Sequence, residues 1–332
     1  MEYRILGKTG AEVSAISLGT WQVGGRWGEA FDAGLAERII EAAIDRGVNF
    51  IDTADVYSDH ASEAAVGRVV RRVKSRHGDR VLVATKCGRF ISPHVSQGYT
   101  PEVLRGFVEA SLKNTGLDTL DLIQLHCPPT DVYYRPEIFE LFDTLKAEGK
   151  IRWLGVSVEK IEEALKAIAY PNVTTVQIIF NMFRQRPAGL FFREARARQI
   201  GVIARVPLAS GLLAGHYSRA TRFGAGDHRT FNRDGAAFDK GETFSGVEFD
   251  QGLAAVEALK SLFHGELALA SWALRWVLMF PEVSTVIPGA SRVDQLEANL
   301  AAGALRPLTP AEMEGVASIY ERFIKASVHQ RW

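Results

Sequence analysis

Short apolar runs that suit buried β-strands alternate with helix-like segments along the whole 332-residue chain. This alternation predicts βα units with a parallel sheet, rather than a β-sandwich or a helical bundle. Eight such runs are present, and eight parallel strands close a (β/α)8 barrel, the TIM-barrel class of α/β fold. We therefore expect a single barrel domain over residues 1–332. The expected strands are Ala15–Leu18, Asn49–Thr53, Val81–Thr85, Asp121–Leu125, Trp153–Ser157, Thr174–Ile178, Gly201–Val206 and Val283–Ile287.

The helices between these strands carry recognisable end signals. Thr100-Pro101-Glu102 combines a capping hydroxyl, a first-turn proline and an acid that favours the positive end of the helix dipole. Gly116 can supply the left-handed residue that ends the same helix. Thr309-Pro310-Ala311-Glu312 has the form of a capping box, and it predicts an extra C-terminal helix beyond the eighth strand.

Three segments depart from a bare barrel. Residues 2–14, which contain the turn from Gly7 to Gly10, are expected to form a hairpin that plugs the N-terminal end of the barrel. Residues 207–245 form a long loop after the seventh strand, and loops of this length are usually lids or binding loops. A disordered surface insertion is the alternative. Residues 328–332 are placed to fold back over the barrel mouth.

Composition and charge exclude several kinds of partner. Lys plus Arg and Asp plus Glu both number 39, so the formal charge is zero and no global field attracts nucleic acid or an anionic membrane. No run approaches the ~18 apolar residues of a membrane span, and the N-terminus lacks the apolar core of a signal peptide. Two cysteines are too few for a secreted disulfide framework. We expect a soluble, unprocessed, cytoplasmic protein.

The two cysteines, Cys87 and Cys127, stand at the ends of two adjacent predicted strands. A zinc site that combines them with His126 is conceivable, but no C-x-x-C or H-x-x-x-H spacing supports it. We interpret the thiols as pocket-wall residues and expect no metal.

Four reactive side chains lie at the ends of three successive predicted strands. Asp52 and Tyr57 stand at and just past the end of one strand, Lys86 follows the next strand, and His126 follows the third. The C-terminal ends of the strands are where an α/β barrel builds its active site. Singly, each residue has an ordinary alternative role: helix cap, packing, structural ion pair or turn residue. Together they indicate catalysis.

The chemistry of this group is proton donation to an oxygen. A tyrosine has a pKa near ~10 and gives up its proton reluctantly unless something stabilises the phenolate. A neighbouring Lys86 ammonium favours ionised Tyr57 and so makes it usable as a general acid. Asp52 would keep Lys86 charged, and a ring N–H of His126 could orient the oxygen. The arrangement suits protonation of an oxygen on which negative charge develops.

With these residues in place, the chain resembles the aldo-keto reductases over nearly its whole length. The resemblance implies a carbonyl reductase in which Asp52, Tyr57, Lys86 and His126 form the catalytic tetrad and Tyr57 donates the proton. The matching segments are Gly19-Thr20-Trp21, the run from Asn49 to Ala54, Tyr57, Glu63 to Gly67, Thr85-Lys86, Asp121 to His126, Gly155-Val156-Ser157, Gln177, Asn181, Pro207-Leu208 and Val286 to Gly289.

The resemblance also implies a nicotinamide cofactor, bound without a Rossmann fold. No G-x-G-x-x-G opens a helix after a strand, which agrees with this. Gly289-Ala290-Ser291-Arg292 stands at the start of the predicted helix that contains Gln295 and Asn299. A helix N-terminus with a hydroxyl, from Ser291, and an arginine, Arg292, suits a phosphate on physical grounds. The family's pattern puts the adenosine 2′-phosphate at this helix start, so we favour NADP(H). By resemblance Ser157 and Gln177 hold the carboxamide, and the other expected cofactor residues are Gly19, Thr20, Trp21, Asp52, Arg205, Pro207, Leu208, Gly211, Gly289, Ser291, Arg292, Gln295 and Asn299.

Three positions depart from the family's pattern. Val158 stands where many members have Asn, and Phe180 replaces a frequent Tyr. Arg205 replaces a Tyr that stacks on the nicotinamide in many members. Arg205 could stack on the ring, pair with the pyrophosphate, or form a structural ion pair.

The substrate pocket is expected from the loops: Trp21, Trp27, Tyr57, Arg89, Phe90 and His126. Its aromatic residues suit apolar aldehydes or ketones, whereas Arg89, Arg222 and Arg229 suit sugars or acidic carbonyl compounds. An NADPH-dependent aldehyde or ketone reductase is the leading hypothesis. An NAD(P)-dependent sugar or secondary-alcohol dehydrogenase that uses the same site is the alternative, and a cofactor-binding regulatory subunit is a third. The family default is a monomer, and an oligomer is possible.

Overall fold

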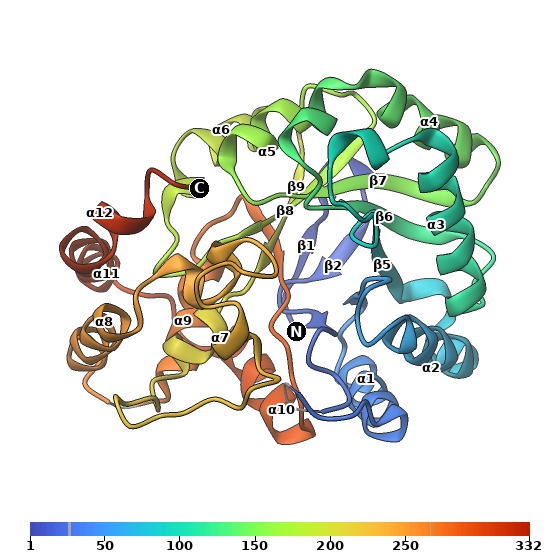
Figure 1. Ribbon diagram of the computed structural model, residues 1–332. Coiled ribbons are helices and arrows are strands. Elements are labelled where there is room, and N and C mark those ends of the chain that lie inside the picture. The colour runs from blue at the N-terminus through green and yellow to red at the C-terminus, as the bar shows by residue number, and fades with distance from the viewer. Residues whose placement is uncertain (26–27, 266) are drawn as a thin grey trace.

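Eight parallel strands form the barrel of the computed structural model, which describes residues 1–25, 28–265 and 267–332. Neighbouring strands follow the order of the chain, and two bridges, Ile16 to Val286 and Gly19 to Gly289, join the first strand region to the last. The predicted TIM-barrel fold is therefore confirmed (Figure 1). The strands are β3 (Leu18–Gly19), β4 (Phe50–Asp52), β5 (Leu82–Cys87), β6 (Leu120–His126), β7 (Ile151–Ser157), β8 (Val173–Ile179), β9 (Gly201–Arg205) and β10 (Val283–Val286).

Helices surround the strands on the outside of the barrel (Figure 1). The expected capping at Thr100 is present, because its side chain accepts a hydrogen bond from the Val103 N–H, and Gly116 ends that helix in the left-handed conformation. The capping box of Thr309 and Glu312 opens the extra C-terminal helix. The helices are α1 (Ala33–Asp45), α2 (Ala61–His77), α3 (Pro101–Thr115), α4 (Pro136–Ala147), α5 (Ile161–Ala167), α6 (Leu190–Ala197), α7 (His228–Phe231), α8 (Phe249–Leu262), α9 (Leu269–Leu278), α10 (Val293–Ala301), α11 (Pro310–Phe323) and α12 (Lys325–Val328).

The N-terminal hairpin closes one end of the barrel, as expected. Strands β1 (Tyr3–Ile5) and β2 (Glu12–Ser14) pair antiparallel. Leu6 and Val13, at the hairpin, are fully buried and cluster with strand residues that fill the barrel interior, among them Phe50 and Ile203. Figure 1 shows the hairpin in blue, near the centre of the ring of strands.

The long segment 207–245 is built from short helical turns, so a disordered insertion does not describe it. It contains α7 and the 3-10 turns Ala209–Ala214, Lys240–Glu242 and Phe244–Gly246. Asn181, just past β8, anchors both of its ends, because the Asn181 amide donates to the Val206 carbonyl and to Ser245 Oγ, each at 2.8 Å.

The C-terminal residue packs on this segment. Trp332 Nε1 donates to Asp239 at 2.7 Å, and the Arg184 guanidinium lies 4.2 Å from the centre of the Trp332 ring. The end of the chain therefore folds back, as expected, but its last residue contacts residues 239–246 and does not line the cavity described below. Within the described ranges, no helix combines the length and apolar character of a membrane span.

Candidate active site

Lys86 is the centre of a buried polar group at the C-terminal ends of β4 and β5. Its ammonium donates to Asp52 Oδ1 at 2.5 Å, to the Thr53 carbonyl at 2.8 Å and to Tyr57 Oη at 3.2 Å. The Lys86 side chain is completely buried and Asp52 is 2% exposed. The parallel pairing of β4 with β5 brings these residues together, because it aligns the ends of the two strands.

The second carboxylate oxygen of Asp52 is held by two amides. Gln124 Nε2 lies 3.0 Å from Asp52 Oδ2, and Gln177 Nε2 lies 2.7 Å from it. These two donors fix the orientation of the Asp52 carboxylate toward Lys86. Gln124 was not among the predicted site residues, although a Gln inside the apolar run of β6 was a usable signal.

His126 ends β6 and faces Tyr57, with the ring centroids 6.0 Å apart in an edge-on arrangement. Burial, reinforced by the positive charges of Lys86 and Arg89, holds the pKa of His126 well below its usual range. The imidazole is therefore neutral at neutral pH and keeps one N–H to donate. Its Nδ1 is buried and has no hydrogen-bond partner among the described residues.

The acidity of Tyr57 differs from the expectation. Lys86 acts in the predicted direction, but burial outweighs it and, with the Asp52 charge, raises the pKa of Tyr57. Burial also opposes the charge on Lys86, yet Asp52 and Tyr57 more than compensate and raise the pKa of Lys86. The pair is therefore an ammonium beside a protonated phenol, the protonation state that a general acid needs before it reacts.

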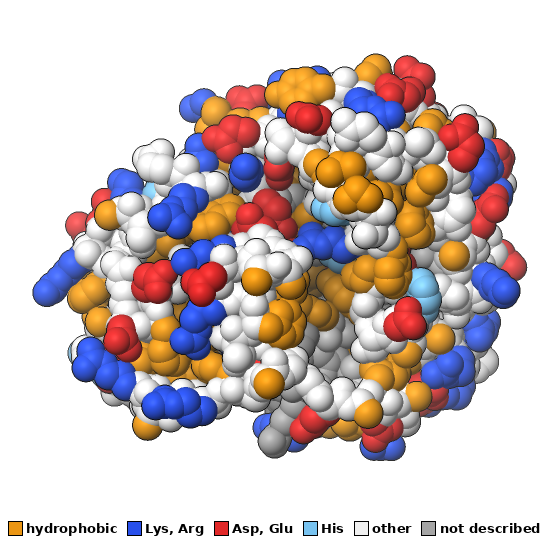
Figure 2. Space-filling view, viewed as in Figure 1, with side chains coloured by type: hydrophobic (Ala, Val, Ile, Leu, Met, Phe, Trp, Pro, Cys, Tyr) orange, Lys and Arg blue, Asp and Glu red, His pale blue; other side chains and the backbone are white. Residues whose placement is uncertain are grey.

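A cavity of about 600 Å³ opens beside this group, and the surface is hollowed near the middle of the view in Figure 2. Asp52, Tyr57 and His126 lie in its wall. Of the residues expected to bind the cofactor, Ser157 alone is absent from the wall; it is buried, with its hydroxyl 3.4 Å from Cys127 Sγ. The expected cofactor residues that line the cavity are Gly19, Thr20, Trp21, Asp52, Gln177, Arg205, Pro207, Leu208, Gly211, Gly289, Ser291, Arg292, Gln295 and Asn299.

The residues expected around the substrate separate into two groups. Trp21 lines the cavity and stacks near Tyr57, with ring centroids 6.2 Å apart. Neither Arg89 nor Phe90 is part of the cavity wall: Arg89 pairs with Glu242, which does line the cavity, and Phe90 is 41% exposed. Trp27 lies outside the described residues.

Further residues complete the wall, and segment 207–245 contributes several of them. Arg229, considered above for a sugar or acidic substrate, is among them, and Ile287 and Pro288 belong to a segment that matched the family's pattern. The sequence did not single out the others, which are Gln22, Val206, Ser210, Ala214, His216, Tyr217, His228, Glu242, Ala268, Ala270, Asp294 and Ala298.

Arg205, at the end of β9, forms an ion pair in this structure, which was the structural alternative for it. Its Nη2 lies 3.1 Å from Glu159 Oε2 and its Nη1 lies 3.5 Å from Glu242 Oε2. Arg89 Nη2 lies 3.4 Å from Glu242 Oε1. Arg205 also lines the cavity, and its Nε is buried without a partner among the described residues.

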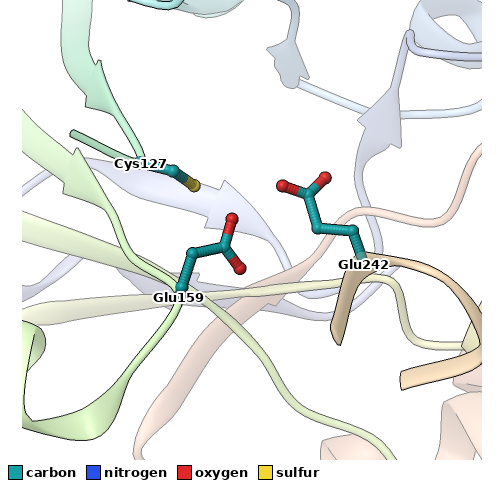
Figure 3. Close-up of side chains that lie close together, drawn as sticks. All are labelled: Cys127, Glu159 and Glu242. Carbon is teal, nitrogen blue, oxygen red and sulfur yellow. The ribbon is translucent and has the colours of Figure 1, made fainter. Parts of the chain in front are cut away.

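Cys127, Glu159 and Glu242 point toward one another in Figure 3, with ligand atoms within 4.8 Å. Burial opposes ionisation of Glu242, but Arg205 and Arg89 outweigh it and lower the pKa of Glu242 to about 2. Burial and the Glu242 charge raise the pKa of Glu159 well above its usual range. Burial also raises the pKa of the Cys127 thiol. A protonated thiol and two carboxyl groups already beside guanidinium groups are a poor site for a metal cation.

The alternative zinc site of Cys87, Cys127 and His126 does not assemble. In the part of the chain that the structure describes, the only closely spaced group of possible metal ligands is the one in Figure 3, and it contains neither Cys87 nor His126.

Comparison with known proteins relates nearly the whole chain to one family. The family model for the Aldo/keto reductase family matches residues 15–321. The chain belongs to this family. Aldo-keto reductase YhdN of Bacillus subtilis is 32% identical over 306 residues, covering 90% of this chain and 87% of the relative.

Two solved structures of aldo-keto reductases agree with the fold. The holo form of AKR11C1 from Bacillus halodurans superposes with a TM-score of 0.77 at 25% identity, covering 100% of this chain and 99% of that one. The glycerol dehydrogenase AKR11B4 from Gluconobacter oxydans gives a TM-score of 0.75 at 28% identity, with 97% and 96% covered. The chain is therefore an oxidoreductase of the aldo-keto reductase family.

Proposed function

We propose that this aldo-keto reductase uses NADPH to reduce aldehydes or ketones to alcohols, with Tyr57 as the general acid. The observation that carries the proposal is the 3.2 Å contact between Tyr57 Oη and the buried Lys86 ammonium, in the wall of a 600 Å³ cavity. That cavity reaches from Tyr57 to Arg292, so it is large enough for a small carbonyl compound beside an extended cofactor.

The residues present fit a nicotinamide dinucleotide. Arg292 occupies the N-cap position of α10 and its side chain accepts no capping hydrogen bond, and the positive end of this helix lies at the cavity, where it favours an anion. Ser291 and Arg292 would hold the 2′-phosphate, and Pro207 and Leu208 supply an apolar wall toward the reacting end. The nicotinamide supplies a hydride to the carbonyl carbon when it is bound.

The tetrad supplies the proton. Neutral His126 donates its N–H to the carbonyl oxygen and holds it near Tyr57. Tyr57 would give its proton to this oxygen as negative charge develops on it, and would be left as a phenolate. Lys86 stabilises this phenolate, and Asp52 keeps Lys86 charged. Solvent then reprotonates Tyr57.

The same site supports the reverse reaction, and the likeness to a glycerol dehydrogenase favours a second candidate. In that case NAD(P)⁺ would serve as the hydride acceptor when bound, the substrate would be a sugar or secondary alcohol, and Tyr57, as phenolate, would accept the hydroxyl proton. The relative concentrations of the substrates, rather than the residues, separate the two directions.

Loss of NADPH absorbance with a panel of small aldehydes, ketones and aldoses tests the proposal. In Tyr57→Phe we expect kcat to fall by about 10²- to 10⁴-fold, because one positioned proton donor is lost, while NADPH affinity is retained. Tyr134→Phe makes the same chemical change at a 65% exposed position and should be silent.

Two results would count against the proposal. Retained turnover in Tyr57→Phe would exclude Tyr57 as the proton donor. A wild-type protein that binds neither NADPH nor NADH would remove the cofactor assignment itself. Oxidation of alcohols without reduction of any carbonyl compound would instead favour the dehydrogenase.

A further inference from the structure

Arg292 and Asp294 form a two-point ion pair in the cavity wall at the start of α10. Arg292 Nε lies 3.0 Å from Asp294 Oδ1, and Arg292 Nη2 lies 3.1 Å from Asp294 Oδ2. Both residues line the same cavity as the tetrad. The guanidinium proposed to hold the 2′-phosphate is therefore already engaged by a carboxylate of the chain itself.

We propose that Asp294 is a cofactor-specificity residue that weakens binding of NADPH relative to NADH, and so allows this enzyme to use both. The inference rests on the proposed function, because it concerns the same cofactor site. It adds that Asp294 limits how strongly the enzyme prefers a cofactor with a 2′-phosphate.

Competition for one guanidinium is the first reason. An arginine binds a phosphate best through two parallel N–H bonds, and here Asp294 occupies two of these donors. A 2′-phosphate bound through the Nε–Nη2 edge of Arg292 would have to displace the carboxylate, and one bound through Nη1 would share the guanidinium charge with it. NADH has a hydroxyl at that position and makes no such demand on Arg292.

Charge repulsion is the second reason. Hydrogen bonds from Arg292 lower the pKa of Asp294, so the carboxylate is fully ionised at neutral pH. A phosphate monoester carries about −1.5 to −2 charges under the same conditions. The carboxylate opposes this anion, whereas it can accept a hydrogen bond from a ribose hydroxyl. Because both side chains are more than half exposed, the effect is expected to be moderate and sensitive to salt.

The test is a pair of dissociation constants, for NADPH and NADH, measured by quenching of intrinsic tryptophan fluorescence in wild type and Asp294→Asn. We expect the variant to bind NADPH about two- to ten-fold more tightly, with NADH unchanged or somewhat weaker. The gain should shrink at high salt.

Glu297→Gln is a matched control. Glu297 lies on the same helix, pairs with Arg46 and lines a different cavity, so its removal changes the net charge equally without touching the Arg292 site. We expect no selective change in this variant. An equal gain for NADPH in Glu297→Gln would assign the effect to net charge and overturn the proposal.

A second variant tests the competition directly. In an Arg292→Gln background, Asp294→Asn should give a smaller gain for NADPH, because the contested guanidinium is gone. An undiminished gain, or equal changes in NADPH and NADH affinity in the single variant, would overturn the inference and leave the proposed function standing. Absence of binding by both cofactors to wild type would instead remove the proposed function.

Discussion

Asp52 and Asp55, two buried aspartates near Tyr57, differ in the number of hydrogen-bond donors around them. Asp52 has three donors, from Lys86, Gln124 and Gln177. Asp55 lies three residues further along and is equally buried, but only one of its oxygens accepts a hydrogen bond, from the Val56 N–H at 2.7 Å. Its Oδ2 is buried without a partner among the described residues. Burial and the nearby Glu63 charge raise the pKa of Asp55 to about 7.

Replacement of Asp55 by Asn is therefore expected to stabilise the protein above neutral pH. The pKa is about 7 in the folded chain and about 3.9 in the unfolded chain, so folding stability is lost as the pH rises from about 4 to about 7. Asn keeps an acceptor for the Val56 N–H and carries no charge. We expect the free energy of unfolding at pH 8 to rise by on the order of 2 kcal/mol, with little difference at pH 4.

Chemical denaturation of wild type and Asp55→Asn across this pH range measures the effect. Asp59→Asn, a 90% exposed position in the same loop, is the control and should leave the pH profile unchanged. A difference between wild type and Asp55→Asn that does not grow with pH would show that Asp55 is not protonated in the folded protein.

The position of each tetrad residue could be predicted from sequence, but its acidity could not. Strand ends are visible as the ends of apolar runs, and parallel strands bring those ends together. The pKa of Tyr57 depends on the balance between burial and the Lys86 charge, and burial is set by neighbours distant in sequence. The ion pair of Arg205 with Glu242 could not be predicted either. Glu242 lies in a segment without the helix or strand periodicity that would indicate where its side chain points.

At the scale of elements, the segment 207–245 is joined to the barrel by buried charge. Glu242 stands between Arg205 at the end of β9 and Arg89 after β5, at 3.5 Å and 3.4 Å. Its backbone carbonyl also accepts a hydrogen bond from Ser210 Oγ, at the other end of the segment. The Glu242 side chain thus links the segment to two strand ends at the wall of the cavity.

The variant Glu242→Gln should loosen this segment. Removal of one member of a buried ionic group leaves positive charge without its partner, and we expect a loss of about 2–4 kcal/mol in the free energy of unfolding. Loss of the Glu242 charge also removes one cause of the raised pKa of Glu159, so Glu159 should ionise and compensate in part.

Hydrogen exchange of segment 207–245, together with denaturation, measures both effects. Glu248→Gln removes an exposed acid paired with Lys240 next to the same segment, and its cost should be small. Equal exchange in the Glu242 variant and wild type would mean that the ion pairs do not hold the segment.

Element positions were predicted more fully than element contacts. Seven of the expected strands overlap β4 to β10, because each is a distinct apolar run. The first is shorter and later than expected: β3 is Leu18–Gly19, and Ala15 to Ser17 join β10 through separate hydrogen bonds to and from Val286. No sequence signal distinguishes a regular strand pairing from isolated hydrogen bonds of this kind.

At the scale of the whole molecule, one end of the barrel holds the candidate active site and the other is closed by the hairpin. The C-terminal end carries the proposed tetrad, the cavity and the segment 207–245, of whose wall residues the sequence indicated only Pro207, Leu208, Gly211 and Arg229. The N-terminal end is closed by the hairpin, and its core could be foreseen because apolar Leu6 and Val13 had to be buried somewhere. In α/β barrels the first end serves chemistry and the second serves stability.

The variant Leu6→Ala should therefore lower stability without altering catalysis. Leu6 is fully buried in the cluster that contains Phe50, Leu122 and Ile203, so its truncation leaves a cavity at the closed end of the barrel. We expect a loss of about 2–5 kcal/mol in the free energy of unfolding. At temperatures where the variant remains folded, kcat and KM should equal those of wild type. Ile5→Ala, at a neighbouring 52% exposed position, should cost far less. A fall in kcat for folded Leu6→Ala would mean that packing at the closed end of the barrel controls the geometry of Lys86 and Tyr57 at the other.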